Sequence, residues 1–157
     1  MLCGKKTVRK LDEIKSLRES SFESLDIALN KRYEVIEDLI NYSRSIFDED
    51  NRFIIKLLEA KLIPVKERFP VEKELIVGLS KLIKTISSTD ENINSKELTG
   101  LRLSLAKSEK YIFEAVNNLN RLTKEYNEAI LQFPQSIIAK ARKIEPEPMV
   151  QVKYITR

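Results

Sequence analysis

The stretch LTGLRLSLAKSEKYIFEAVNNLNRLTKEYNEAILQF, residues 98–133, decides the fold of this 157-residue chain. A repeat of 3.5 residues places side chains on one face of a helix, and that face packs against partner helices. Asn94 with Glu97 predicts a capping box just before the stretch. We therefore predict one long helix that ends near Phe133, because Pro134 follows it. Apolar and small residues return at steps of three and four throughout the stretch, at Leu98, Leu101, Leu105, Ser108, Ile112, Ala115, Leu119, Leu122, Tyr126, Ala129 and Phe133.

Toward the N-terminus, a second apolar repeat predicts a helix over residues 11–47. The acidic cluster at residues 48–51 suits a turn and the start of a second helix. Pro64 ends or kinks that helix, and Pro70 fits the first turn of a third, which gives way to a polar loop at residues 87–92. The residues alone leave two arrangements open. Either residues 64–70 form a hairpin, which gives four helices, or they kink one middle helix, which gives three.

Toward the C-terminus, a short helical turn is expected at residues 135–143. The sequence Glu145-Pro-Glu-Pro148 that follows predicts a stiff, extended segment. The length suits one domain with its own core. We therefore divide the chain into a basic N-terminal tail at residues 1–10, a helical bundle at residues 11–143 and an extended C-terminal tail at residues 144–157.

The composition argues against most enzyme classes. The chain has no His, three Gly and one Cys. Without imidazole, proton shuttling near neutral pH and most zinc and di-iron sites lose their usual side chain. No glycine-rich phosphate loop is present either. We therefore predict a protein that is not an enzyme, with no catalytic, metal-binding or cofactor-binding residues and no cofactor.

The charge of the chain is uneven. Its 28 Lys and Arg against 24 Asp and Glu give a net charge of +4, but both ends are basic and the body is mildly acidic. A bundle whose first and last helices are antiparallel brings these ends together, where they would form a basic pole. This pole either faces an anionic membrane or another polyanion, or is an ordinary solvated end of the bundle. The residues predicted for this basic pole are Lys5, Lys6, Arg9, Lys10, Lys140, Arg142 and Lys143.

Three blocks of sequence resemble a known family. The first is Leu29-Asn-Lys-Arg-Tyr33, followed by Ile36 and Leu39. The second is Leu105-Ala-Lys-Ser108-Glu109 with Ile112 three residues later. The third, with the most specific spacing, is Leu119-Asn120, Tyr126-Asn127, Ile130 and Phe133-Pro134. These blocks are similar to the signature of the LemA family of bacterial proteins, although Glu37 and Leu119 stand where that family usually has Pro and Tyr.

The resemblance implies an all-α fold, an antiparallel up-down four-helix bundle with long helices 1 and 4 and a shorter hairpin of helices 2 and 3. It carries no transferable enzymatic activity. The family typically begins with one transmembrane helix, so either such a span lies outside this sequence or this member lacks one. The residues that the resemblance marks as structural are Arg32, Tyr33, Glu109, Tyr126, Asn127, Phe133 and Pro134.

The antiparallel arrangement of the first and last helices places Arg32 near Ile112, one turn from Glu109. We therefore predict a partly buried Arg32–Glu109 ion pair that fixes helix register, rather than an anion-binding role for Arg32. The asparagines on the last long helix, among them Asn120 and Asn127, are interpreted as a solvated polar face rather than an interaction face.

The predicted function is a non-enzymatic protein-interaction or scaffold module at the bacterial membrane surface. Its partner would be an unidentified protein, an anionic membrane surface, or both, and self-association stays open. The alternative is a soluble cytoplasmic protein that binds nucleic acid or another polyanion through the basic pole. No sequence-specific nucleic-acid binding is expected, because aromatic residues do not alternate with basic ones. A chain that truly starts at Met1 would be soluble and cytoplasmic.

Overall fold

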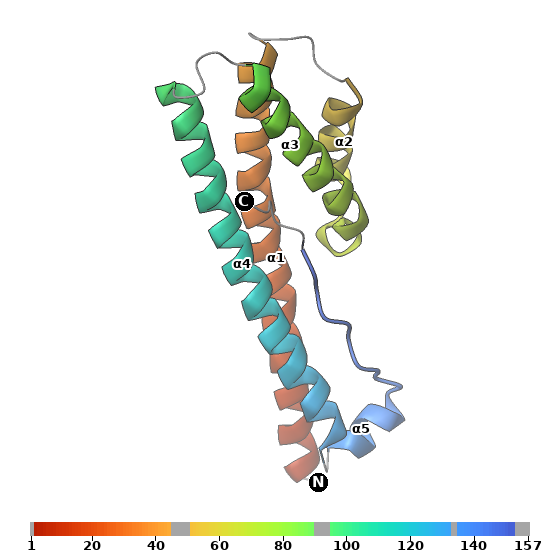
Figure 1. The fold of residues 1–157 in the computed structure, drawn as a ribbon. Coiled ribbons are helices and arrows are strands. Elements are labelled where there is room, and N and C mark those ends of the chain that lie inside the picture. The colour runs from red at the N-terminus through yellow and green to blue at the C-terminus, as the bar shows by residue number, and fades with distance from the viewer. Residues whose placement is uncertain (1, 45–50, 90–94, 133–134, 153–157) are drawn as a thin grey trace. The chain divides into compact units, whose positions relative to one another are not determined.

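The computed structural model describes residues 2–44, 51–89, 95–132 and 135–152, and the regular structure in these ranges is helical. The all-α class is therefore confirmed for the part of the chain that the structure describes (Figure 1). The elements in chain order are α1 (Leu2–Arg44), α2 (Asn51–Leu62), the 3-10 turn η1 (Val65–Glu67), α3 (Phe69–Thr89), α4 (Lys96–Leu131) and α5 (Gln135–Ala141).

Helix α1 begins at Leu2, nine residues before the predicted start at Leu11. The prediction followed the first apolar repeat. Lys and Arg have a high helix propensity, so the basic sequence before Leu11 is compatible with a longer helix. The segment predicted as an N-terminal tail is thus helical from Leu2 onward. The predicted helix end near Phe47 lies outside the described residues, which follow α1 to Arg44.

The Pro64–Pro70 segment joins α2 and α3 through η1. Pro64 has φ −53° and ψ 141°, and its carbonyl accepts a hydrogen bond from the Glu67 amide at 2.9 Å. Pro70 then lies in the first turn of α3, where its missing amide costs no helical hydrogen bond. Residues 87–89 continue α3 instead of forming the predicted loop. The hydroxyl of Ser88 donates to the carbonyl of Thr85 at 3.0 Å, which keeps this polar side chain bonded within the helix.

Helix α4 is capped by Ser95, whose hydroxyl accepts the Leu98 amide at 3.1 Å. The predicted cap, Asn94, lies outside the described residues. The last helical residue is Leu131, two before the predicted end, and Phe133 and Pro134 also lie outside the described residues. The predicted stripe is buried over most of its length, at Leu98, Leu105, Ser108, Ile112, Leu119, Leu122, Tyr126 and Ala129.

The chain divides into two compact units, and both long helices contribute to each. Unit 1 comprises Met1–Ser24 and Glu114–Gln151. In it, Arg18 and Ser21 of α1 bond to Thr123 and Asn118 of α4, so the two helices run antiparallel. Helix α5 adds to the same core, which is formed by Leu11, Tyr126, Ala129, Ile130 and Ala139.

Unit 2 comprises Leu25–Phe113 and Val152–Arg157. Helices α2 and α3 pack against each other here, and their contact is close at Gly78. A Cβ atom at Gly78 would lie 2.7 Å from Cδ2 of Phe53, so the ring occupies the space that a side chain would need. The core of unit 2 is built mainly of Leu25, Leu29, Ile36, Leu39, Leu57, Leu75, Leu79, Ile86, Leu98 and Ile112.

Candidate functional site

Two asparagines of α4 hold the C-terminal segment of unit 1, residues 144–151. The side-chain amide of Asn127 donates from Nδ2 to the carbonyl of Glu147 at 2.9 Å, and its Oδ1 accepts the Glu147 amide at 2.8 Å. Asn120 does the same with Val150, at 2.8 Å to the carbonyl and 2.7 Å from the amide. We call this pair the asparagine clamp. In these four hydrogen bonds, the partners of both asparagine side chains are main-chain atoms of the C-terminal segment.

The spacing of the asparagine clamp matches an extended chain. Asn120 and Asn127 are separated by two turns of α4, about 10.5 Å of helix at 1.5 Å per residue. Glu147 and Val150 are separated by three residues, which span about 10 Å in extended form. The lower-numbered asparagine binds the higher-numbered residue. The segment therefore runs antiparallel to α4 and in register with it.

The chain returns toward α4 through a tight turn after α5. Lys143 has φ 55°, in the left-handed region that a side chain rarely adopts. The amides of Lys143 and Ile144 donate to the carbonyls of Lys140 and Ala139 at 3.2 and 2.8 Å. This is the Schellman pattern of helix termination, with Lys143 where glycine is usual. Ile144 then packs against the core of unit 1.

A buried arginine lies next to the C-terminal segment. Arg18 is 7% exposed, and its Nε donates to Oγ1 of Thr123 at 2.9 Å. Its guanidinium carbon lies 4.9 Å from the centroid of the Phe22 ring. The carboxylate of Glu147 lies 3.9 Å from Nη1 of Arg18 and stays partly exposed. Glu147 therefore makes two contacts: its main chain bonds to Asn127, and its carboxylate lies near the buried Arg18.

Tyr126 lies in the core of unit 1, one residue before Asn127. Burial raises the pKa of its hydroxyl, and the carboxylates of Glu147 and Asp12 raise it further while Arg18 lowers it. Together with Lys15 and residues 143–147, Tyr126 lines a hollow of about 350 Å³ beside the returning segment. The hydroxyl therefore stays neutral over the physiological pH range.

The cations predicted for the basic pole are only partly free of acidic neighbours. Arg9, Lys10, Lys140, Arg142 and Lys143 are exposed residues of unit 1. However, Arg9 lies 3.9 Å from Glu13, and Arg142 lies 3.9 Å from Asp12. The side chains of Lys5 and Lys6 lie outside the described residues. The surface is thus mixed in charge rather than uniformly basic.

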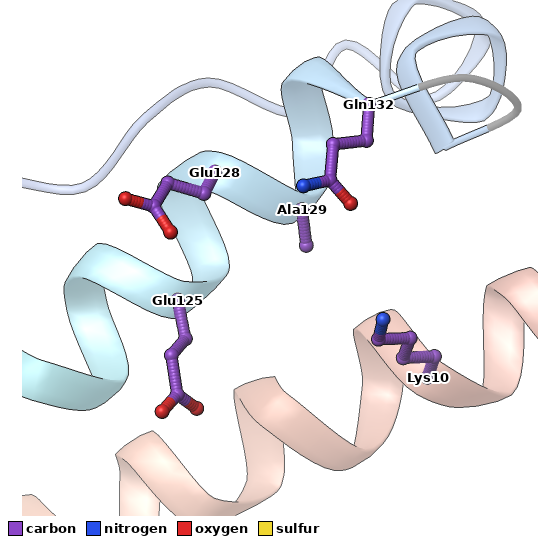
Figure 2. Close-up of a pocket in the computed structure, with 5 residues that line it drawn as sticks. All are labelled: Lys10, Glu125, Glu128, Ala129 and Gln132. Atoms are coloured by element: carbon purple, nitrogen blue, oxygen red, sulfur yellow. The ribbon is translucent and has the colours of Figure 1, made fainter.

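Lys10 shows the same mixture at closer range. It lines a hollow of about 240 Å³ with four residues of α4: Glu125, Glu128, Ala129 and Gln132. Figure 2 shows Lys10 and Gln132 pointing into the space between the two helices, with Glu125 extending from α4 toward α1 and Glu128 directed away from Lys10. Because two acidic groups share this hollow with one amine, it is not an anion site.

Unit 2 contains a fully buried ion pair. Nη2 of Arg32 lies 2.6 Å from Oε2 of Glu72 on α3, and the two side chains are 0% and 1% exposed. Burial raises the pKa of the Glu72 carboxyl, and the charge and hydrogen bond of Arg32 offset this only in part. The other oxygen of Glu72 and the hydroxyl of Tyr33 are buried without a hydrogen-bond partner in the described chain.

Arg68 ties the α2–α3 hairpin to α1 in the same unit. Its Nη1 donates to Asp26 at 2.6 Å, and its Nε and Nη2 donate to the carbonyl of Ile63 at 3.0 and 2.6 Å. Its guanidinium also lies over the Tyr33 ring. Arg32 and Tyr33 are both fully buried, and neither faces solvent.

The predicted Arg32–Glu109 pair stays a prediction. Arg32 forms an ion pair with Glu72, and Glu109 is half-buried on α4. Within the described ranges, no group of three or more acidic or thiol side chains is arranged to hold a metal ion.

A model of the LemA family matches residues 21–157. The chain belongs to the LemA family. No curated protein sequence and no solved structure matches the chain significantly. Among the described helices of this LemA protein, none is long and apolar enough to cross a membrane.

The LemA-like block around Tyr126 and Asn127 coincides with the asparagine clamp. Asn127 was selected from the sequence as structural, and its contacts to Glu147 explain why an amide is needed there. The interpretation of the α4 asparagines as a solvated face was wrong for Asn120 and Asn127, which are half-buried and bond to the C-terminal segment. Asn118 is exposed and also donates to Ser21. The heptad spacing of Asn120 and Asn127 was the available signal, because only residues on one face can bind one extended chain.

Proposed function

We propose that this LemA protein is a non-enzymatic interaction module that holds an extended polypeptide segment along α4 at the bacterial membrane surface. The observation that carries the proposal is the asparagine clamp, in which Asn120 and Asn127 each bind a main-chain amide and carbonyl. Main-chain groups are the same in almost every residue, so this contact suits the binding of polypeptide better than small-molecule chemistry.

We also propose the up-down four-helix arrangement as the scaffold of this module. The antiparallel packing of α1 and α4 within unit 1 supports it. Within unit 2, the α2–α3 contact and the Arg32–Glu72 pair between α1 and α3 support it as well. Such a scaffold holds the helix that carries the clamp rigidly, because its core residues come from several helices.

Hydrogen exchange of single amides tests the clamp. The Glu147 and Val150 amides should exchange slowly in the native chain, because Asn127 and Asn120 accept their hydrogens. In the Asn120→Ala/Asn127→Ala variant we expect exchange to accelerate roughly tenfold or more, as each amide loses one hydrogen bond. Asn117→Ala, at an exposed position of α4, is the control and should change neither rate. Free-peptide exchange rates at both amides in the native chain would contradict the proposal.

Flotation with liposomes tests the membrane part separately. The exposed cations of unit 1 support a gain of about 1 kcal/mol per residue near anionic headgroups. We expect the chain to float with vesicles of phosphatidylglycerol and phosphatidylcholine but not with phosphatidylcholine alone. Lys140→Glu/Lys143→Glu should weaken this binding, whereas Lys81→Glu/Lys84→Glu on exposed positions of α3 should not. Flotation that ignores lipid charge would contradict a membrane-surface location.

A further inference from the structure

We propose that Asn120, Asn127 and Arg18 form a peptide site that binds, in trans, an extended segment with a carboxylate three residues before an aliphatic residue. In the structure, Glu147 and Val150 of the chain's own C-terminal segment occupy this site. This inference rests on the proposed function, since it takes the asparagine clamp as the binding surface, and it names the chemical class of the partner.

The preference for a carboxylate comes from Arg18. Its side chain is 8% exposed and bonds to the neutral hydroxyl of Thr123, while the acid facing it belongs to the C-terminal segment. A cation that is nearly buried gains most from a carboxylate delivered to its remaining open side. An incoming segment with a neutral or basic residue at this position would leave the Arg18 charge uncompensated.

The preference for an aliphatic residue comes from the position of Val150. Val150 is 7% exposed, whereas Met149 before it is 50% exposed. Glu145, Pro146 and Pro148 are exposed as well. Side-chain selection therefore falls on the same two residues whose main chains the asparagine clamp holds, three positions apart.

The resident segment can be displaced because its attachment is thin. It is held by four hydrogen bonds from its main chain to asparagine side chains of α4, by the 3.9 Å contact of Glu147 with Arg18, and by the burial of Val150 and the partial burial of Ile144. Each such hydrogen bond contributes about 0.5–1.5 kcal/mol. Its advantage over a free peptide is that the turn at Lys143 keeps it close, at an effective concentration of the order of millimolar. A variant that disrupts this turn removes the advantage without changing the site.

The test is fluorescence anisotropy with a labelled peptide of sequence IEPEPMVQV, residues 144–152, added to the full chain. Lys143→Pro forces φ to about −65°, which is incompatible with the native 55°, and releases the resident segment. We expect this variant to bind the peptide roughly tenfold or more tightly than the native chain, because the intramolecular competitor is gone. Lys143→Gly removes the same charge but keeps the turn, so its binding should stay as weak as that of the native chain.

Two peptide variants distinguish specific binding through the main chain and Glu147 from nonspecific binding. A peptide methylated on the Val150 nitrogen lacks the hydrogen that Asn120 accepts, and a peptide with Glu147→Lys places a cation against Arg18. We expect both to lose roughly tenfold or more in affinity for the Lys143→Pro chain. If Lys143→Pro lowers helix content by circular dichroism, Glu147→Lys/Val150→Asp in the full chain frees the site while leaving the turn intact.

Two results would overturn the inference. One is equal binding of the methylated and unmethylated peptides. The other is an absence of peptide binding to both released variants. If the Glu147 and Val150 amides are nonetheless protected from exchange in the native chain, the proposed function stands and only binding in trans fails.

Discussion

The surroundings of two buried arginines differ between the two units of this protein. Arg32 in unit 2 faces a carboxylate, Glu72, that is itself 1% exposed. Arg18 in unit 1 faces the hydroxyl of Thr123 and a carboxylate, Glu147, that is 44% exposed and belongs to a segment without regular structure. The first pair is closed to solvent and to ligands. The second is completed by a residue that can leave, which is why we place binding in unit 1 and assign unit 2 a structural role.

The largest effect should come from removing Glu72. Glu72→Ala removes the buried carboxylate that pairs with Arg32, and breaking such a pair costs about 3–5 kcal/mol. Urea denaturation should show this loss in the free energy of unfolding. Lys61→Ala removes a partly exposed ion pair with Glu37 and should cost about 0–1 kcal/mol. Similar losses in the two variants would contradict the view that unit 2 is sealed around Arg32.

A second prediction concerns the packing of unit 2 at Gly78. Gly78→Ala places a methyl group 2.7 Å from the Phe53 ring, and we expect the overpacking cost of about 1–3 kcal/mol to outweigh the gain in helix propensity. Gly100→Ala is the matched control, because a Cβ atom there meets nothing within 4 Å. That variant should gain up to about 1 kcal/mol from helix propensity. Thermal unfolding of both variants should show shifts of opposite sign, and a stabilised Gly78→Ala would mean that the hairpin packs more loosely than described.

The ionisation of Glu72 predicts how the stability of the fold depends on pH. Burial raises the pKa of Glu72 in the folded chain above its unfolded value, so the folded state binds this proton more tightly. Stability should therefore fall as pH rises from about 4.3, the usual carboxyl value, to the raised native pKa, by at most about 1.4 kcal/mol per pH unit.

The Glu72→Gln variant has no such proton. The difference in stability between the native chain and this variant should change with pH in that window, whereas Glu74→Gln on the exposed face of α3 should preserve the native profile. Urea midpoints measured from pH 4 to pH 8 give both profiles. Parallel curves for the native chain and Glu72→Gln would show that Glu72 titrates as an ordinary surface carboxyl.

The smallest effect is expected at Lys143 in unit 1. A side chain in the left-handed region costs about 1 kcal/mol, and glycine removes this cost while losing some chain entropy. Lys143→Gly should therefore stabilise the fold by about 0.5 kcal/mol. Lys140→Gly removes the same charge inside α5 and should destabilise it by about 1 kcal/mol. The two melting temperatures should move in opposite directions, and equal losses would mean that the turn is not formed.

The helices were predictable because their signals are local. The three-and-four spacing on α4 and the prolines around η1 act within one or two turns, so the sequence alone located these elements. The start of α1 was not predictable from the apolar repeat, because that repeat begins only at Leu11. The asparagine clamp was not predicted from the sequence for a different reason. Asn120 can be placed against the C-terminal segment only if the chain is known to turn back after α5. The turn at Lys143 has no glycine, which is the usual sequence signal for such a turn.

The pairing of Arg32 shows the same limit over a longer distance. Glu72 could be recognised as an acid in the first turn of a helix, which the helix dipole favours. Its second role depends on which helix α3 packs against. A pair separated by 40 residues is fixed by the geometry of the α2–α3 hairpin, and no local pattern around Arg32 or Glu72 reports it.

The asparagine clamp also limits which substitutions the C-terminal segment can accept. Proline has no amide hydrogen, so it cannot occupy residue 147 or 150 without losing a bond to Asn127 or Asn120. The two prolines of the segment, Pro146 and Pro148, fall on positions whose main chain the clamp does not touch, and there they stiffen the chain. Glu145 and Met149 are equally unconstrained by it. Most positions of the segment can therefore be substituted during evolution, but residues 147 and 150 do not tolerate proline.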